Sequence, residues 1–317
     1  MIWSAGIQAM FRSFFGLLAL AVSACSLAQQ TAPAPARQNP SPMVEHTRTH
    51  ARLPSDSPRS GLRSAITGIL TRPIHVFVPA AGPPPRALLV HFNGAVYVAE
   101  HAAARSGRYV LANVQLSAGS RAYEEPFRDP AVMQQLVDAA RRAAGLETFD
   151  SVVLSAFSAG YGAIRAVLRD QPSAERIDGL VLLDGLHTGY LPEGRVLHEG
   201  GRLDTAPLQP FEQFARAAVE GRRTFVLAHS EIFPGTFAST TETADWLIRR
   251  LGLSRTPVLR WGVLGMQQLS EVCAGRLLVQ GFAGNAAPDH VDHLHALHHF
   301  LALHDSLRDS AGSACSH

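Results

Sequence analysis

Cysteine and net charge are both scarce in this chain. Only three of its 317 residues are cysteines, and 28 basic against 26 acidic residues leave a formal net charge of +2. Three cysteines are too few for a fold that depends on a network of disulfide bonds. A chain near neutrality without a basic stripe is also a poor match for nucleic acid, so we expect no nucleic-acid partner. No internal repeat is found, which argues against a repeat architecture.

The N-terminus has one short apolar run and almost no charge. Residues 14–22 are largely apolar, a run too short to span a membrane but typical of a secretory signal, which we predict over residues 1–28. The sequence Val-Ser-Ala-Cys that ends at Cys25 resembles a bacterial lipobox, whose cysteine becomes the lipidated first residue of the mature protein. Cleavage after Ala28 is the alternative. We expect export, either as an outer-membrane lipoprotein or as a periplasmic or secreted protein.

Residues 29–60 are rich in proline, alanine, serine and threonine and poor in large apolar residues. Such a segment cannot bury a core, so we predict a flexible leader. The remainder, residues 61–317, has the length of one large α/β domain. In an oxidising compartment Cys273 and Cys315 could form a disulfide, with two unpaired thiols as the alternative.

Strand-like apolar runs alternate with helical patterns along this domain. Runs that are apolar on both faces, joined by amphipathic helices, are typical of a mostly parallel sheet covered by helices on both faces, so we predict an α/β fold. The first two runs look like neighbouring strands, and residues 186–215 interrupt the pattern as an inserted, lid-like segment would. The predicted strands are Arg72–Pro79, Arg86–His91, Tyr109–Leu116, Ser151–Phe157, Gly179–Asp184, Thr224–Ala228 and Arg276–Gly281. The predicted helices are Pro130–Ala144, Gly160–Asp170, Thr241–Leu251 and His290–Leu307.

The segment around Ser158 carries the strongest functional pattern. A buried strand turns abruptly at Ser158 into a helix that small residues open, in the sequence Ser-Ala-Phe-Ser-Ala-Gly-Tyr-Gly. A serine hydroxyl becomes an effective nucleophile when such a turn directs it towards a base and places it beside backbone amides. Ala156 replaces the first glycine of the Gly-x-Ser-x-Gly pattern. A capping serine at an ordinary strand-to-helix turn is the alternative interpretation.

A nucleophilic serine needs a base, and an acid that orients the base, and both are expected after strand ends later in the chain. Asp184 ends the strand that follows the predicted helix after Ser158, and Glu231 is its rival after the next strand. His290 is the first histidine after a flexible segment near the C-terminus, and His293 lies one turn later. We predict a triad of Ser158, His290 and Asp184, with Glu231 and His293 as open alternatives.

Two backbone amides near Ser158 would have to bind the oxyanion. The residue after the nucleophile, Ala159, is expected to supply one of them. The other is expected from the glycine-containing loop that follows the predicted strand ending at His91, where Ala95 and Asn93 are the candidates.

The C-terminal region is rich in histidine, which raises the hypothesis of a metal site. His295 and His299 are four residues apart, a spacing that suits two ligands on one helix face. A His-Glu-x-x-His pattern is lacking, and solvated or core-edge histidines explain most of these side chains better. We therefore expect no metal site.

These parts together resemble the α/β-hydrolase superfamily over residues 70–305. The chain order Ser158, Asp184, His290 is the order of nucleophile, acid and base in that superfamily. The resemblance implies a serine hydrolase that cleaves an ester or a related acyl bond of a small substrate through an acyl-enzyme, without a cofactor. Esterases, lipases, peptidases and acyltransferases share these elements. A non-catalytic, surface-anchored binding protein of the same fold and a metal-dependent hydrolase are the alternatives.

Overall fold

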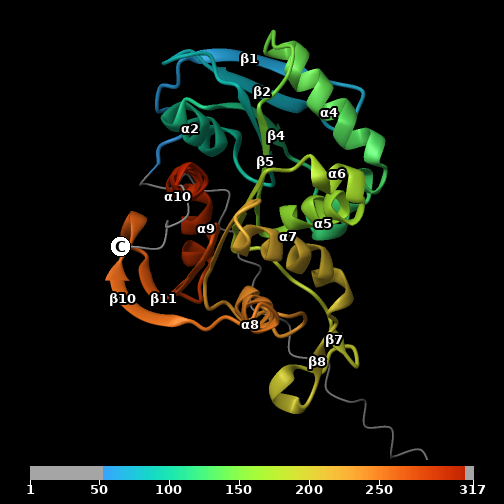
Figure 1. The fold of residues 1–317 in the computed structure, drawn as a ribbon, viewed down its shortest axis with the longest axis vertical. Helices are drawn as coiled ribbons and strands as arrows, with labels where there is room; N and C mark the ends of the chain where they lie inside the picture. The colour runs from blue at the N-terminus through green and yellow to red at the C-terminus, as the bar shows by residue number, and fades with distance from the viewer. Residues whose placement is uncertain (1–52, 311–317) are drawn as a thin grey trace, which may run out of the picture. The chain divides into compact units, whose positions relative to one another are not determined.

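The computed structural model describes residues 53–310 (Figure 1). The predicted signal, the lipobox cysteine Cys25, most of the leader and Cys315 therefore lie outside the described residues. Cys273 is disulfide-bonded, and its predicted partner is among the residues outside that range. Within residues 53–310, every helix is either too short or too polar to cross a membrane.

A single large sheet positions the rest of the described chain. Its strand order is β1-β2-β4-β3-β5-β6-β9-β12-β11-β10. The strands from β4 to β12 in this order pair in parallel, and the outer strands pair antiparallel. The strands are β1 Gly61–Ile66, β2 Ile74–Pro79, β3 Ala87–Phe92, β4 Tyr109–Val114, β5 Ser151–Phe157, β6 Gly179–Leu183, β9 Thr224–His229, β10 Thr256–Trp261, β11 Gln267–Ala274 and β12 Leu277–Phe282. A separate pair is formed by β7 Tyr190–Leu191 and β8 Arg202–Leu203.

Helices cover both faces of this sheet, with α2 and α10 on one side and α4, α5 and α6 on the other (Figure 1). Because side chains alternate along a strand, Leu89 of β3 packs in one core with Phe300, whereas Leu88 packs in the other core with Ile164. The predicted fold class, an α/β fold with a mostly parallel sheet and helices on both faces, is confirmed. The helices are α2 Val96–Ser106, α3 Ser120–Glu124, α4 Pro130–Ala143, α5 Tyr161–Arg169, α6 Gln171–Glu175, α7 Gln209–Val219, α8 Thr240–Arg250, α9 Ala287–His295 and α10 Leu297–Asp309.

Two predictions about the arrangement are wrong. The first two predicted strands, β2 and β3, are not neighbours, because β4 lies between them and pairs antiparallel to β2 and parallel to β3. The chain leaves β3, crosses over through α2 and returns as β4 on the side where β2 lies. The predicted helix His290–Leu307 is two helices, α9 and α10, which meet at Ala296.

Several elements were not predicted because they lack the patterns on which prediction depends. The edge strands β1 and β10 are mostly exposed, so they show no buried apolar alternation. Helix α2 begins after Ala95, which makes no side-chain capping hydrogen bond, so the usual start signal is missing.

A buried carboxylate ties β1 and β2 to α2. Glu100, of which 3% is exposed, accepts hydrogen bonds from Arg63 at 2.7 Å, from Arg59 at 3.0 Å and from His75 at 2.8 Å. Burial by itself would raise the pKa of Glu100, but these hydrogen bonds outweigh burial and lower it to about 2. The carboxylate is therefore ionised at neutral pH and stabilises the fold in that form.

We expect Glu100→Gln to lower the free energy of unfolding at pH 7 by about 3 kcal/mol, because it leaves the largely buried Arg59 and the partly exposed Arg63 without their counter-charge. The folded-state pKa lies below the ordinary value of 4.5, so the contribution of Glu100 is complete above 4.5 and is lost as the pH falls through about 2. Urea unfolding of wild type and Glu100→Gln at pH 7 and pH 3 measures the difference in their free energies of unfolding, which should be smaller at pH 3. Glu125→Gln, which removes an exposed carboxylate, is the control. Equal stability of Glu100→Gln and wild type at pH 7 would contradict the assignment.

Candidate active site

Ser158 lies at a sharp turn between β5 and α5. The turn is a single 3₁₀ turn, Ser158–Gly160, and Ser158 has a φ of 49°, a left-handed conformation that is uncommon for residues other than glycine. The end of β3 comes so close to this turn that position 160 needs a glycine, since a Cβ there would lie 2.3 Å from the carbonyl oxygen of Phe92. Ser158 is partly exposed, whereas the strand before it is buried. The backbone thus presents this serine at the carboxyl end of a central strand.

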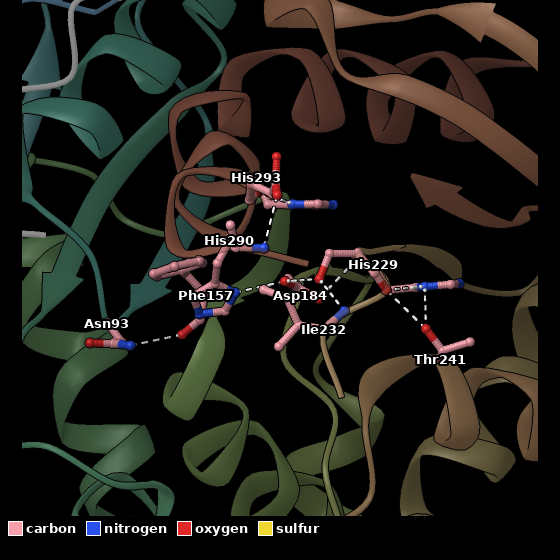
Figure 2. Close-up of polar contacts among 11 residues, drawn as sticks. Asn93, Phe157, Asp184, His229, Ile232, Thr241, His290 and His293 are labelled. Atoms are coloured by element: carbon pink, nitrogen blue, oxygen red, sulfur yellow. Dashed lines mark hydrogen bonds and ion pairs between the residues drawn. The ribbon is translucent and has the colours of Figure 1, made fainter. Parts of the chain in front are cut away.

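Asp184 follows β6, the neighbour of β5 in the sheet, and also has a positive φ, 44°. Its Oδ2 accepts hydrogen bonds from His290 Nδ1 and from the Ser230 hydroxyl, both at 2.7 Å (Figure 2). Its Oδ1 accepts a hydrogen bond from the Ser230 amide at 3.0 Å. The carboxylate is therefore held in one orientation, with its Oδ2 directed at the imidazole.

The electrostatics of Asp184 favour the ionised form. Burial alone would raise the pKa of this carboxyl, but the hydrogen bond and charge of His290 outweigh burial, with help from Ser230. The net effect is a pKa well below the usual range. A buried, permanently ionised acceptor fixes the proton of His290 on Nδ1 and leaves Nε2 as the basic nitrogen of the neutral ring.

His290 lies in the first turns of α9, and its ring packs beside the turn that carries Ser158. The centroids of the His290 and Phe157 rings are 4.5 Å apart, and Phe157 directly precedes Ser158 (Figure 2). From the other side, a Cβ on Gly185 would lie 2.7 Å from the Ser158 nitrogen, so the turn after Asp184 touches the same backbone. The fold thus brings together three residues that are distant in sequence.

The alternative acid and base, Glu231 and His293, make other contacts. Glu231 is exposed, and its amide donates to the carbonyl of Gly284 at 2.9 Å. His293 is buried, its Nδ1 donates to the carbonyl of Asp289 at 2.9 Å, and its ring lies parallel to that of Phe300. Of the four acid and base candidates, Asp184 and His290 are the two that the structure pairs. Ser230, which orients Asp184, was not predicted, because its two hydrogen bonds to Asp184 join residues 46 apart in the sequence.

The loop after β3 also lies against the turn at Ser158. Asn93 has a φ of 63°, its amide donates to the Val114 carbonyl at 3.1 Å, and its Nδ2 donates to the Phe157 carbonyl at 3.0 Å. Its Oδ1 accepts from the Tyr123 hydroxyl at 3.1 Å. Asn93 therefore ties the loop to β4 through its amide and to β5 through its side chain, and its predicted role as an oxyanion donor stays a prediction that this occupied amide disfavours.

Ala95 is the remaining loop candidate. The amide of Gly94 is taken by Gln115 Oε1 at 2.8 Å, and within residues 53–310 no backbone hydrogen bond uses the Ala95 amide. Ala95 is exposed and Ala159 is partly exposed. These two are the candidate positions whose amides a substrate oxygen could approach.

A second serine and histidine pair lies nearby, in the core. The Ser155 hydroxyl and His91 Nδ1 are 2.5 Å apart, and both residues are 0% exposed. Burial lowers the pKa of His91 to about 3, and its Nε2 has no hydrogen-bond partner. In the described chain no carboxylate contacts this imidazole, so the pair lacks both an orienting acid and access to substrate.

The histidine-rich C-terminal region does not form the predicted helix face. His295 ends α9 and His299 lies in α10, and their rings contact Tyr97 and Phe300 respectively. Within residues 53–310, no group of three or more metal-ligating side chains has the arrangement of a metal site.

The segment predicted as a lid, residues 186–215, contains β7, β8 and the first part of α7. It is attached to the start of α8 because the Tyr190 hydroxyl donates to Glu242 Oε2 at 2.8 Å. Tyr190 and Leu203 also share a small core with Ala238. The interpretation of residues 186–215 as a lid-like insertion stays a prediction.

No protein-family model and no curated protein matches this chain. Among solved structures, it is similar to an esterase of Pyrobaculum calidifontis, with 14% identity and a TM-score of 0.46 over 82% of this chain and 88% of that chain. It is also similar to the metagenomic carboxylesterase EstE1, with 15% identity and a TM-score of 0.46 over 86% of this chain and 99% of that chain. A third similar structure is brefeldin A esterase, a bacterial homologue of human hormone sensitive lipase, with 18% identity and a TM-score of 0.44 over 86% of this chain and 83% of that chain. These identities and TM-scores are too low to carry a function to this chain.

Proposed function

We propose that this protein is a serine hydrolase that cleaves an ester or a related acyl bond through an acyl-enzyme. The observation that supports this most directly is the 2.7 Å hydrogen bond between Asp184 and His290 beside a serine held at a positive φ. Nucleophile, base and orienting acid are the minimum set for activating a serine hydroxyl.

In this mechanism the Ser158 oxygen attacks the acyl carbon while His290 Nε2 takes the hydroxyl proton. The bond to the leaving alcohol then breaks, and His290 returns the proton to that oxygen. Asp184 stabilises the charged imidazole throughout. The amides of Ala159 and Ala95 bind the negative oxygen of the tetrahedral intermediate, where one donor is worth about 3 kcal/mol. Water activated by His290 then releases the acyl group and restores Ser158.

Inhibition of hydrolysis distinguishes this proposal from the other two classes. The substrate is p-nitrophenyl acetate, and the purified protein is first incubated with a fluorophosphonate or with a metal chelator. We expect the fluorophosphonate to abolish hydrolysis and the chelator to leave it unchanged. The reverse pattern would indicate a metal-dependent hydrolase. Absence of turnover with a panel of esters would indicate a binding protein of this fold.

We also propose that the protein is exported and held at a membrane through lipid on Cys25. Two acyl signals or more are needed for stable anchoring, which lipobox processing supplies. We expect Cys25→Ser to move the protein from the membrane fraction to the soluble fraction with unchanged hydrolytic activity per molecule. A wild-type mature protein that begins near Gln29 and is freely soluble would contradict the anchor but not the hydrolase.

A further inference from the structure

His187 lies beside the proposed triad but has no part in the mechanism above. It follows Asp184 by three residues, and its ring lies edge-on between two aromatic rings. The centroid distances are 5.5 Å to Tyr161, which begins α5 after the turn at Ser158, and 5.0 Å to Phe237, from the loop between β9 and α8. Three segments that border the site therefore meet at this imidazole.

One hydrogen bond holds the His187 ring, and a second joins the backbone beside it to the same loop. His187 Nδ1 lies 2.9 Å from the carbonyl oxygen of Ala238, and the Ala238 amide donates to the carbonyl of Thr188 at 2.9 Å. The segment after β6 is thus fastened to the loop that carries Phe237. A ring held in this way loses little rotamer freedom when a ligand binds.

The same contacts define where the proton of His187 resides. A carbonyl oxygen only accepts, so Nδ1 carries the hydrogen and Nε2 presents a lone pair. Burial lowers the pKa of His187, with the charges of His290 and Arg165 acting in the same direction and that of Asp184 opposing them. Within residues 53–310 the side-chain hydrogen bond of His187 is made through Nδ1, and the residue is partly exposed. His187 therefore offers a fixed hydrogen-bond acceptor at the edge of the site.

The surroundings of this acceptor are apolar. Phe237 and Phe233 of the same loop are 38% and 51% exposed, unusually high for phenylalanine. The ring of Phe233 lies 6.3 Å from that of His198, on the segment that contains β7 and β8. A ligand at this position would meet aromatic faces and edges around one nitrogen that can only accept.

We propose that His187 is a specificity-determining residue, and that the substrate is an ester with a free hydroxyl group, which donates to His187 Nε2 while its carbon chain packs against Phe237. The proposal deepens the function proposed above and rests on it. A site built to bind a hydroxyl group discriminates against the analogue that lacks it, because the bound analogue covers the acceptor and leaves it unpaired.

Two pairs of esters, each differing by a hydroxyl in place of a methyl group, test this directly. 2-Hydroxyethyl butyrate against propyl butyrate places the hydroxyl on the alcohol side. Ethyl 3-hydroxybutyrate against ethyl 3-methylbutyrate places it on the acyl side. We expect the wild type to prefer the hydroxylated member of one pair by about tenfold in kcat/KM, the worth of one hydrogen bond between neutral groups.

His187→Phe should bring that ratio to about one, and His187→Gln, which retains an acceptor oxygen, should keep part of it. His101→Phe, at a partly exposed histidine of α2 whose ring contacts His298, is the matched control and should keep all of the ratio. The rate of fluorophosphonate labelling of Ser158, measured in each variant, reports whether the triad is intact. An equal ratio in wild type and His187→Phe, both still labelled, would overturn this proposal alone. Failure to label Ser158 in the wild type would overturn both proposals.

Discussion

Ser158→Ala is expected to lower kcat/KM for ester hydrolysis by about 10⁶-fold, because it removes the only oxygen that forms the acyl-enzyme in the proposed mechanism. The variant should fold normally, since the Ser158 side chain is at a partly exposed turn. Steady-state hydrolysis of p-nitrophenyl acetate, with circular dichroism to check folding, measures the effect.

Ser155→Ala is the matched control for that variant. Ser155 lies three residues earlier, on β5, and its hydroxyl is 2.5 Å from His91 Nδ1, but it is completely buried. We expect Ser155→Ala to lower stability by about 1–3 kcal/mol, because His91 loses its partner, while activity per folded molecule stays near the wild-type value. If Ser155→Ala were inactive and Ser158→Ala active, the nucleophile would be Ser155.

Asp184→Asn is expected to lower kcat by about 10⁴-fold with little effect on the fold. The asparagine amide would face His290 Nδ1 as a donor, so the imidazole would hold its proton on Nε2 and could not accept one from Ser158. Asp184 is the carboxylate that accepts the hydrogen bond from His290 Nδ1, so the substitution removes the acceptor at this contact. Measurement of kcat for wild type and Asp184→Asn at several pH values tests this expected decrease.

Glu231→Gln provides the control for this second variant, because Glu231 was the rival acid and is exposed. Its kcat should stay within about threefold of the wild type, as expected for a surface substitution away from the triad. A severe loss in Glu231→Gln together with a mild loss in Asp184→Asn would transfer the role of the acid.

Local patterns predicted much of the fold because central strands and amphipathic helices leave periodic signatures. The strand Ser151–Phe157 was predicted with its observed bounds, since it is apolar and followed by small residues that only a tight turn requires. The exposed edge strands have no such signature. The order of β2, β4 and β3 depends on a crossover, which no short segment records.

The candidate site likewise has features that the local sequence encodes and features that depend on tertiary contacts. The turn at Ser158 was predictable because it is encoded within a few neighbouring residues. The sequence favoured His290 but left His293 open, because the choice depends on which face of α9 meets Asp184, a contact between residues 106 apart. Asn93 was expected to donate to an oxyanion, but its amide closes the loop onto Val114. Hydrogen bonds of this kind follow from tertiary packing and leave no signal in the local sequence.

The most direct test of the central claim, that Ser158 is the nucleophile, is residue-level mapping of a covalent adduct. The mature wild-type protein is treated with a fluorophosphonate, digested and analysed by mass spectrometry. We predict one adduct per chain, on the Ser158 hydroxyl, and none in Ser158→Ala. An adduct on Ser155 or another residue, or no adduct in a protein that hydrolyses esters, would contradict the account.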